Sequence, residues 1–192
     1  MQRRHIFAIA AGSLAAPSIL HAQSVAIPQP RASIPDAMTA DGRFTGFMEM
    51  LQRSGVINTL RGAGDFTVFA PTNAGIDSIP ANIRAGLMPT PTNSNPSGIG
   101  DQQALMALCN LHIVDGIHPV SSFNTPNTAL RSRNGTGLRV EQTQERTYRL
   151  VLADAVGPGV GGLNFARPAT ILVPAVMAGN GIILPIDTAL LK

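Results

Sequence analysis

The chain contains very few of the residues that build disulfide frameworks, stacking platforms and charged surfaces. Its 192 residues include one cysteine, one tyrosine and no tryptophan, and only 13% of them are charged. A single cysteine excludes an internal disulfide framework and any cysteine-rich zinc or iron–sulfur site. The low charge, combined with 44% hydrophobic residues, is typical of a compact chain rather than a disordered one.

Glycine and proline are abundant by contrast, with 19 and 15 residues respectively. So many turn-forming residues argue against an all-helical bundle. The length suits one domain with an appendage, and such a domain is large enough to bury a core without disulfides or metals.

The first 23 residues have the composition of an export signal. Arg3 and Arg4 precede an Ala/Leu/Ile-rich run that ends near Leu20, and we predict cleavage after Ala22. The run is interrupted by Pro17 and is shorter than the ~20 apolar residues of a membrane-spanning helix. Export through the Sec or the twin-arginine route fits equally well. We therefore expect a signal peptide at 1–22, a linker at 23–34 and one domain at 35–192.

Cleavage would remove most of the net charge. It takes away two of the 14 Lys and Arg residues and none of the 11 Asp and Glu residues, so 12 cations face 11 acidic groups. The mature chain is then nearly neutral, and its electrostatics give no basis for binding nucleic acid or an anionic membrane.

The hydrophobic pattern predicts helices in the first half and strands in the second. Apolar residues at helical spacing predict a helix from Asp36 onward, a short turn at 56–60, helical pieces broken by Pro80, and a helix at 102–111. Strands are predicted at 66–70, 113–114, 138–141, 148–152, 169–178 and 182–191. This order of elements indicates an α+β domain.

No motif in the sequence supports catalysis. Gly157, Gly159 and Gly162 satisfy a dinucleotide-binding spacing, but a strand-like run rather than a helix follows them, so they indicate a turn. Nucleophile elbows, phosphate-binding loops and zinc-protease motifs are absent. Cys109 lies in an apolar helix without neighbouring cations and is expected to be an inert thiol. We therefore expect no cofactor and no enzymatic activity.

Two polar clusters have a structural interpretation. His112, Asp115 and His118 are spaced three apart on a strand and its turn, and a buried, hydrogen-bonded His112 is favoured over a metal site. Arginines recur near Tyr148 with Glu141 and Glu145 between them, which indicates a solvated hairpin face rather than a nucleic-acid surface. These arginines are Arg131, Arg133, Arg139, Arg146 and Arg149.

Three stretches, taken together and in order, resemble the signature blocks of the fasciclin (FAS1, βig-h3) domain family. They are Phe66-Thr67-Val68-Phe69-Ala70-Pro71-Thr72-Asn73, Leu111-His112-Ile113-Val114-Asp115-Gly116, and the run from Gly179-Asn180-Gly181 to Asp187 and Leu191. The resemblance covers about residues 34–192. It implies an α+β fold, a twisted β-sandwich or wedge flanked by short helices.

The signature residues then take structural roles. Thr67 and Phe69 suit one strand that Pro71 ends, and Thr72 or Asn73 can cap the next helix. Asn180-Gly181 is a tight-turn signal. Asp187 needs a partner if it is buried, and we expect backbone N–H groups of the first block. His112 completes this structural set.

The resemblance also implies a function. Family members act in adhesion and protein–protein contact, so we expect an exported, non-catalytic monomer with a protein or cell-surface partner, periplasmic or extracellular. Some members resemble pigment-binding proteins, so a carrier of an apolar ligand such as a pigment or lipid is the alternative. Leu111 replaces the tyrosine that precedes the central histidine in animal members, which argues against integrin recognition. The loop Met88–Gly100 is the expected site of individual function.

Overall fold

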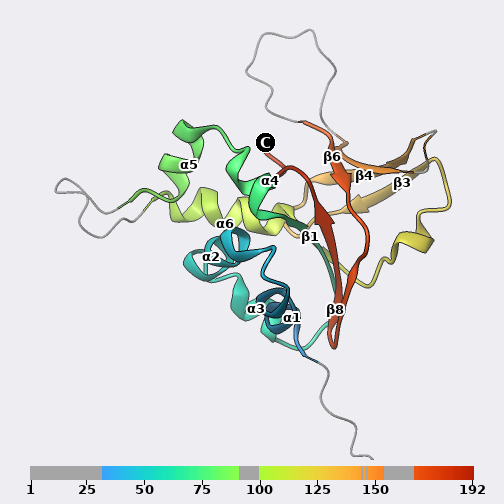
Figure 1. The fold of residues 1–192 in the computed structure, drawn as a ribbon, viewed down its shortest axis with the longest axis horizontal. Helices are drawn as coiled ribbons and strands as arrows, with labels where there is room; N and C mark the ends of the chain where they lie inside the picture. Colours follow the sequence, from blue (N-terminus) through green and yellow to red (C-terminus); the bar gives the residue numbers. More distant parts are fainter. Residues whose placement is uncertain (1–31, 91–99, 144, 146, 154–166) are drawn as a thin grey trace, which may run out of the picture.

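A computed structural model describes residues 32–90, 100–143, 145, 147–153 and 167–192. Short helices gather at one side of the molecule and a curved sheet forms the other (Figure 1). The predicted signal peptide, nearly all of the predicted linker and the Gly157–Gly162 stretch lie outside the described residues, as do 91–99 of the predicted functional loop.

The helices confirm the predicted pattern with one correction. The single helix predicted from Asp36 is two helices, because Gly42 adopts the left-handed conformation (φ 71°) and ends the first of them. The short pieces around Pro80 and the helix that ends at Leu111 are confirmed. No helix in the described part of the chain is long and apolar enough to cross a membrane. The helices are α1 Ile34–Asp41, α2 Thr45–Arg53, α3 Ile57–Arg61, α4 Asn73–Asp77, α5 Ala81–Leu87, α6 Gln102–Leu111 and the 3-10 turn η1 Val120–Ser122.

The strands form one mixed sheet in the order β2-β1-β8-β6-β5-β4-β3, and β7 pairs with β8 beside this path. All neighbours are antiparallel except β1 and β8, which are parallel. The strands are β1 Phe66–Pro71, β2 Ile113–Asp115, β3 Asn127–Arg131, β4 Gly137–Gln142, β5 Tyr148–Leu152, β6 Ala169–Ile171, β7 Val176–Ala178 and β8 Gly181–Ile186.

The parallel pair β1 and β8 forms the centre of the molecule. Every residue of both strands is buried, because helices cover one face of the pair and the rest of the sheet curves over the other. Strands buried on both faces have continuous apolar sequences rather than alternating ones. The unbroken runs of the first and third signature blocks follow from this position.

The strand β8 changes partners along its length. β7 pairs with its first half through Ile183, and β6 pairs with its end at Ile186. Pro185 lies between these two partners, and its carbonyl accepts a hydrogen bond from the Leu172 N–H. The single strand predicted over 169–178 is therefore two strands, since the chain crosses from one side of this junction to the other.

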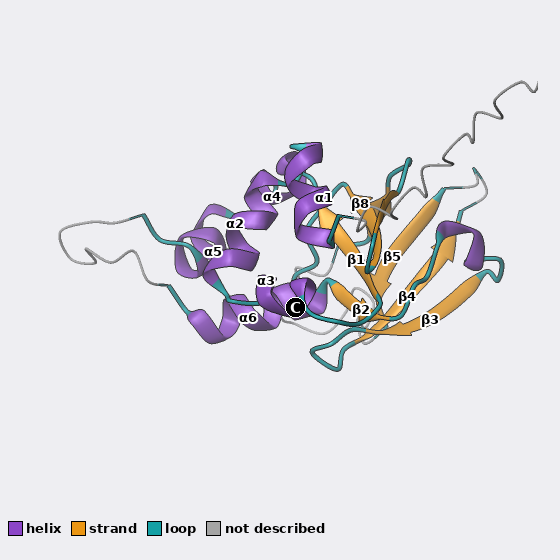
Figure 2. Ribbon diagram, turned by 90° about the horizontal axis from the view of Figure 1, so that it is seen from below, coloured by secondary structure: helices purple, strands orange, loops and turns teal. Residues whose placement is uncertain are grey.

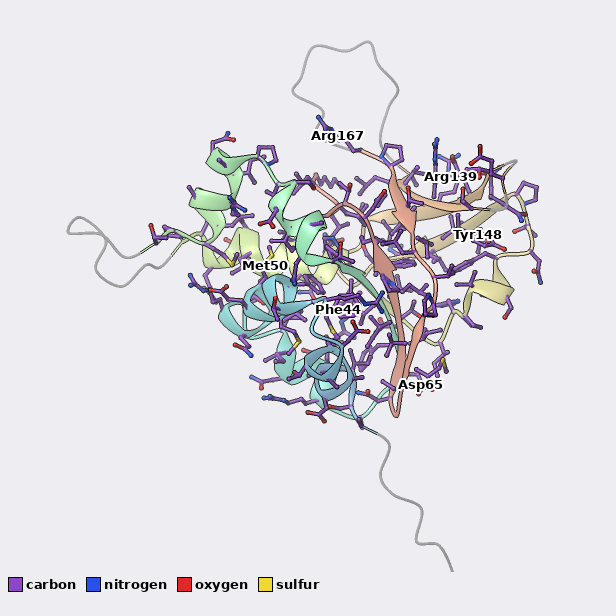
Figure 3. All side chains as sticks on the ribbon, in the orientation of Figure 1. Phe44, Met50, Asp65, Arg139, Tyr148 and Arg167 are labelled. Carbon is purple, nitrogen blue, oxygen red and sulfur yellow. The ribbon has the colours of Figure 1, made fainter. Side chains whose placement is uncertain are left out.

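Two hydrophobic cores lie on opposite faces of β1 and β8. Val68 and Ile183 face a core shared with helices α1, α2, α3 and α6, whereas Phe69 and Leu184 face a core enclosed by the sheet. Phe44 and Met50 lie in the helical half and Tyr148 in the sheet half (Figure 3). Successive side chains of β1 and β8 thus point alternately into the helical core and the sheet core, which joins the two halves of the molecule.

The sheet nearly closes on itself. An isolated bridge joins Val114 of β2 to Ser132, just beyond β3, so the two ends of the strand order meet at one point. The predicted twisted sandwich or wedge flanked by short helices is confirmed. The sequence did not predict β3, whose side chains are at most partly buried.

Candidate functional site

The signature residues lie at joints between elements, and Thr67 is the first of these. Its side chain is completely buried, and its hydroxyl donates to the Gly116 carbonyl at 2.7 Å. The same oxygen accepts from the His118 N–H at 2.8 Å. One hydroxyl on β1 therefore fixes the direction in which the chain leaves β2.

His112 joins α6 to the end of the chain. Its Nδ1 lies 2.8 Å from the Leu108 carbonyl, and its Nε2 accepts from the Leu190 N–H at 3.0 Å. Only the neutral ring with its proton on Nδ1 satisfies both contacts. Complete burial lowers the pKa of His112 to about 4, because the imidazolium would lose its hydration. The prediction of a buried, hydrogen-bonded His112 is confirmed.

Thr72 and Asn73 have different roles. The Thr72 hydroxyl accepts from the Gly75 N–H and caps α4, as predicted. Asn73 instead accepts from the Gly46 N–H and the Thr45 hydroxyl at the start of α2. The sequence did not indicate this contact, because the two partners are 27 and 28 residues away.

Asn180 and Gly181 join α1, α3 and β1 at the tip of the β7–β8 hairpin. The Asn180 side chain accepts from the Ile34 N–H at 2.9 Å and donates to the Leu60 carbonyl at 2.7 Å. The turn residues are Gly179 and Asn180, one position earlier than predicted, and Gly181 opens β8. A Cβ on Gly181 would lie 2.0 Å from the Phe66 carbonyl oxygen, so only glycine fits there.

The expectation for Asp187 is wrong. Its side chain is exposed and accepts from the Thr170 N–H of β6 at 2.7 Å, not from the first signature block. The chain leaves β8 after Ile186, which places Asp187 beside β6. Of the remaining signature residues, Phe69 is buried in the sheet core, and Pro71 is the last residue of β1.

The titratable groups that the structure describes do not converge on one site. His112 points to backbone groups inside the fold, so it does not converge with Asp115, the last residue of β2, or with His118 in the segment that follows. Burial raises the pKa of the Cys109 thiol to about 11, which leaves it protonated. Within the described residues no group of three His, Cys, Asp or Glu side chains can hold a metal ion.

An apolar pocket of about 390 Å³ lies between α5, α6 and the end of the chain. Leu87, Leu108 and Leu191 supply much of its wall, and Asn134 and Lys192 add polar atoms. Its volume is in the range of sites for small ligands. No sequence pattern indicated this pocket, because its walls come from segments far apart in the chain.

A polar cleft of about 490 Å³ lies between the turn after β2 and the strand β3. Asp115 and Arg133 form an ion pair across it at 2.5 Å, and Arg131 and His118 also line it. Arg131 has no ion-pair partner among the residues that the structure describes. Of the predicted solvated arginine face, Arg131, Arg133 and Arg149 are exposed and Arg139 is partly buried, while Arg146 lies outside the described residues.

Comparisons with known proteins agree with this architecture. A family model described as Fasciclin domain matches residues 42–192. The transforming growth factor-beta-induced protein ig-h3 of Sus scrofa is 25% identical over 161 residues, which cover 84% of this chain and 19% of that protein. This chain therefore spans about a fifth of that relative's length.

A solved structure shows the same fold. It is a FAS1 domain pair from the insect cell adhesion molecule fasciclin I, which matches with a TM-score of 0.58 at 17% identity. The match covers 85% of this chain and 52% of that one. Since the family model also spans most of the sequence, this chain belongs to the fasciclin domain family.

Proposed function

We propose that this chain is an exported, non-catalytic fasciclin-domain protein that mediates cell adhesion or protein–protein contact at the cell surface or in the periplasm. The observation that carries the proposal is how the signature side chains are used. Thr67, His112 and Asn180 each direct their polar atoms to backbone groups of another element. Side chains used in this way build a rigid scaffold, and they leave function to the exposed surface.

An adhesion assay tests the proposal. A strain that lacks the protein should adhere less to its natural surface or neighbouring cells, and the purified chain added back should restore adhesion. Unchanged adhesion, together with no partner recovered by crosslinking on intact cells, would contradict the proposal. The matched control is the same chain unfolded by heat, which keeps the composition and loses the surface.

Export rests on the cationic, apolar and small-residue pattern of residues 1–22. Mass spectrometry of the protein from the periplasm or medium should give an N-terminus at Gln23. A cytoplasmic protein that begins at Met1 would contradict this part of the proposal.

Carriage of an apolar ligand is the second candidate, and the pocket of about 390 Å³ favours it. Native mass spectrometry of the chain from its own host should then show a bound apolar molecule. Ala104→Phe would fill the pocket from the wall contributed by α6, whereas Ala85→Phe on α5 is an exposed control outside the pocket lining. No ligand on the wild-type chain, or equal loading of both variants, counts against this function.

A further inference from the structure

The strand β3 is the last strand of the sheet, and the described residues cover only one end of its outer edge. The bridge between Val114 and Ser132 and the hydrogen bond from the Arg133 N–H to the Ile113 carbonyl close that end. In Figure 2, β3 forms the outer margin of the sheet beside β4. No described strand pairs with the outer side of 127–131.

The pairing of β3 with β4 fixes which backbone groups face outward. The Ser132 N–H donates to the Thr136 carbonyl, and the Gln142 N–H donates to the Pro126 carbonyl. Antiparallel hydrogen bonding alternates, so even-numbered residues of β3 bond to β4. The N–H and C=O groups of Asn127 and Ala129 therefore point away from the sheet. In this direction they can form hydrogen bonds with an added strand.

The edge is open because β2 turns away from it. Gly116 has φ 90°, its N–H donates to the Asp65 carbonyl, and its own carbonyl accepts from Thr67. His118 is held by the same Thr67 hydroxyl. These contacts hold the segment after β2 close to β1, so β2 does not continue along β3. The polar cleft lies in the space between this segment and β3.

The surroundings of this edge are basic on one face and apolar on the other. Ala129 and Arg131 are both exposed on the same face of β3. Ala129 pairs with Arg139 of β4, and paired residues lie on one face of a sheet, so Arg139 lies on this solvent face as well. Leu130 points the other way and packs against the sheet core. Around the cleft and along β3, β4 and β5 there are four arginines and two carboxylates, namely Arg131, Arg133, Arg139, Arg149, Asp115 and Glu141.

We propose that the outer edge of β3 binds an extended segment of a partner protein as an additional strand, and that this segment alternates acidic and apolar side chains. The acidic side chains would face Arg131, and the apolar ones would face Leu130, because neighbouring residues of a strand point to opposite faces. The inference rests on the proposed function in protein–protein contact and identifies its surface. A second copy of this chain fits less well, because its own β3 edge is also basic.

The test uses the ¹⁵N-labelled chain and a capped, monomeric eight-residue peptide of alternating valine and glutamate. Binding should shift the amide signals of Asn127, Ala129 and Arg131 and should slow hydrogen exchange at Ala129 at least tenfold. A peptide with lysine in place of glutamate should not bind. Alternate backbone nitrogens of the peptide can be methylated in two ways, on the odd or on the even residues. One of these two peptides should bind at least tenfold more weakly, since it lacks the N–H groups that donate to β3 while the protein is unchanged.

Two charge reversals separate the edge from general electrostatics. Arg131→Glu should weaken binding at least tenfold, whereas Arg149→Glu, two strands from the edge, should change it less than threefold because of distance and screening. Signal shifts centred elsewhere, equal binding of the lysine peptide, or dimerisation through β3 in light scattering each overturn the inference. If the wild-type chain mediates adhesion and Arg131→Glu leaves that adhesion intact, only the inference about β3 is overturned. If the chain binds the peptide but mediates no adhesion, only the proposed function is overturned.

Discussion

At the scale of single residues, His112 couples the fold to pH. Its neutral ring accepts from the Leu190 N–H, and protonation would place a second N–H against that donor. The pKa is about 4 in the folded chain and 6.5 in a solvated histidine, so between these values the unfolded state binds the proton and the folded state does not. The contribution of neutral His112 to the free energy of unfolding is therefore present in full above about pH 6.5 and is lost as the pH drops toward 4.

The size of this effect can be measured by difference. The free energy of unfolding should fall by about 3 kcal/mol between pH 7 and pH 4 on account of His112 alone. Urea unfolding at several pH values in wild type and His112→Gln gives this contribution as the difference between two curves, which cancels the other groups. Parallel curves would show that His112 titrates normally in the folded chain.

Thr67 contributes a hydroxyl whose loss leaves two backbone groups unpaired. Thr67→Val keeps the shape of the side chain but removes the partner of the His118 N–H and the Gly116 carbonyl. We expect the free energy of unfolding to drop by about 1–3 kcal/mol. Thr170→Val on β6 is the matched control and should change it by less than about 0.5 kcal/mol. Equal urea midpoints for the two variants would contradict the role of Thr67.

At the scale of elements, the approach of β1 to β8 depends on Gly181. In Gly181→Ala the new Cβ would meet the Phe66 carbonyl at 2.0 Å, and backbone atoms cannot yield as a flexible side chain does. The variant should lose at least about 3 kcal/mol or fail to fold. Gly86→Ala in α5 meets nothing within 4 Å and should gain about 0.5–1 kcal/mol from helix propensity. Thermal unfolding of both variants checks the contrast.

Most elements could be predicted from the sequence because their side-chain patterns are local. The helix that ends at Leu111 and the runs that became β1 and β8 carry their own periodicity or apolar length. The strand β3 has polar or small residues on its exposed face and only Thr128 and Leu130 turned inward, so its pattern is too weak to identify. The break at Gly42 was missed because the apolar spacing continues across it.

The distant partners of the signature residues could not be predicted, because these contacts join segments far apart in the chain. The hydrogen bond from Asn180 to Leu60 spans 120 positions, and the one from Leu190 to His112 spans 78. The apolar run around Asp187 indicated that this residue needs a partner if it is buried, but only the path of the chain after Ile186 decides that it is exposed. The open edge of β3 likewise depends on where β2 turns, which Thr67 decides from another strand.

At the scale of the whole molecule, the helical half and the sheet half share β1 and β8. Val68 and Phe69 are neighbours in sequence, yet they lie in different cores. A cavity in the helical core should therefore loosen the strands that also hold the sheet core. This arrangement predicts one cooperative unfolding transition rather than separate melting of the two halves.

Leu60→Ala tests this coupling, because Leu60 is completely buried in the helical core. It should lower the free energy of unfolding by about 2–5 kcal/mol. Far-UV circular dichroism reports mainly on the helices, while Tyr148, the single tyrosine in a chain without tryptophan, reports on the sheet core beside Phe123. Both probes should move to the same lower urea midpoint, and Leu150→Ala in the sheet core should move them together as well. Loss of helical signal while the Tyr148 fluorescence stays native would show that β1 and β8 do not transmit the damage, and that the halves are independent units.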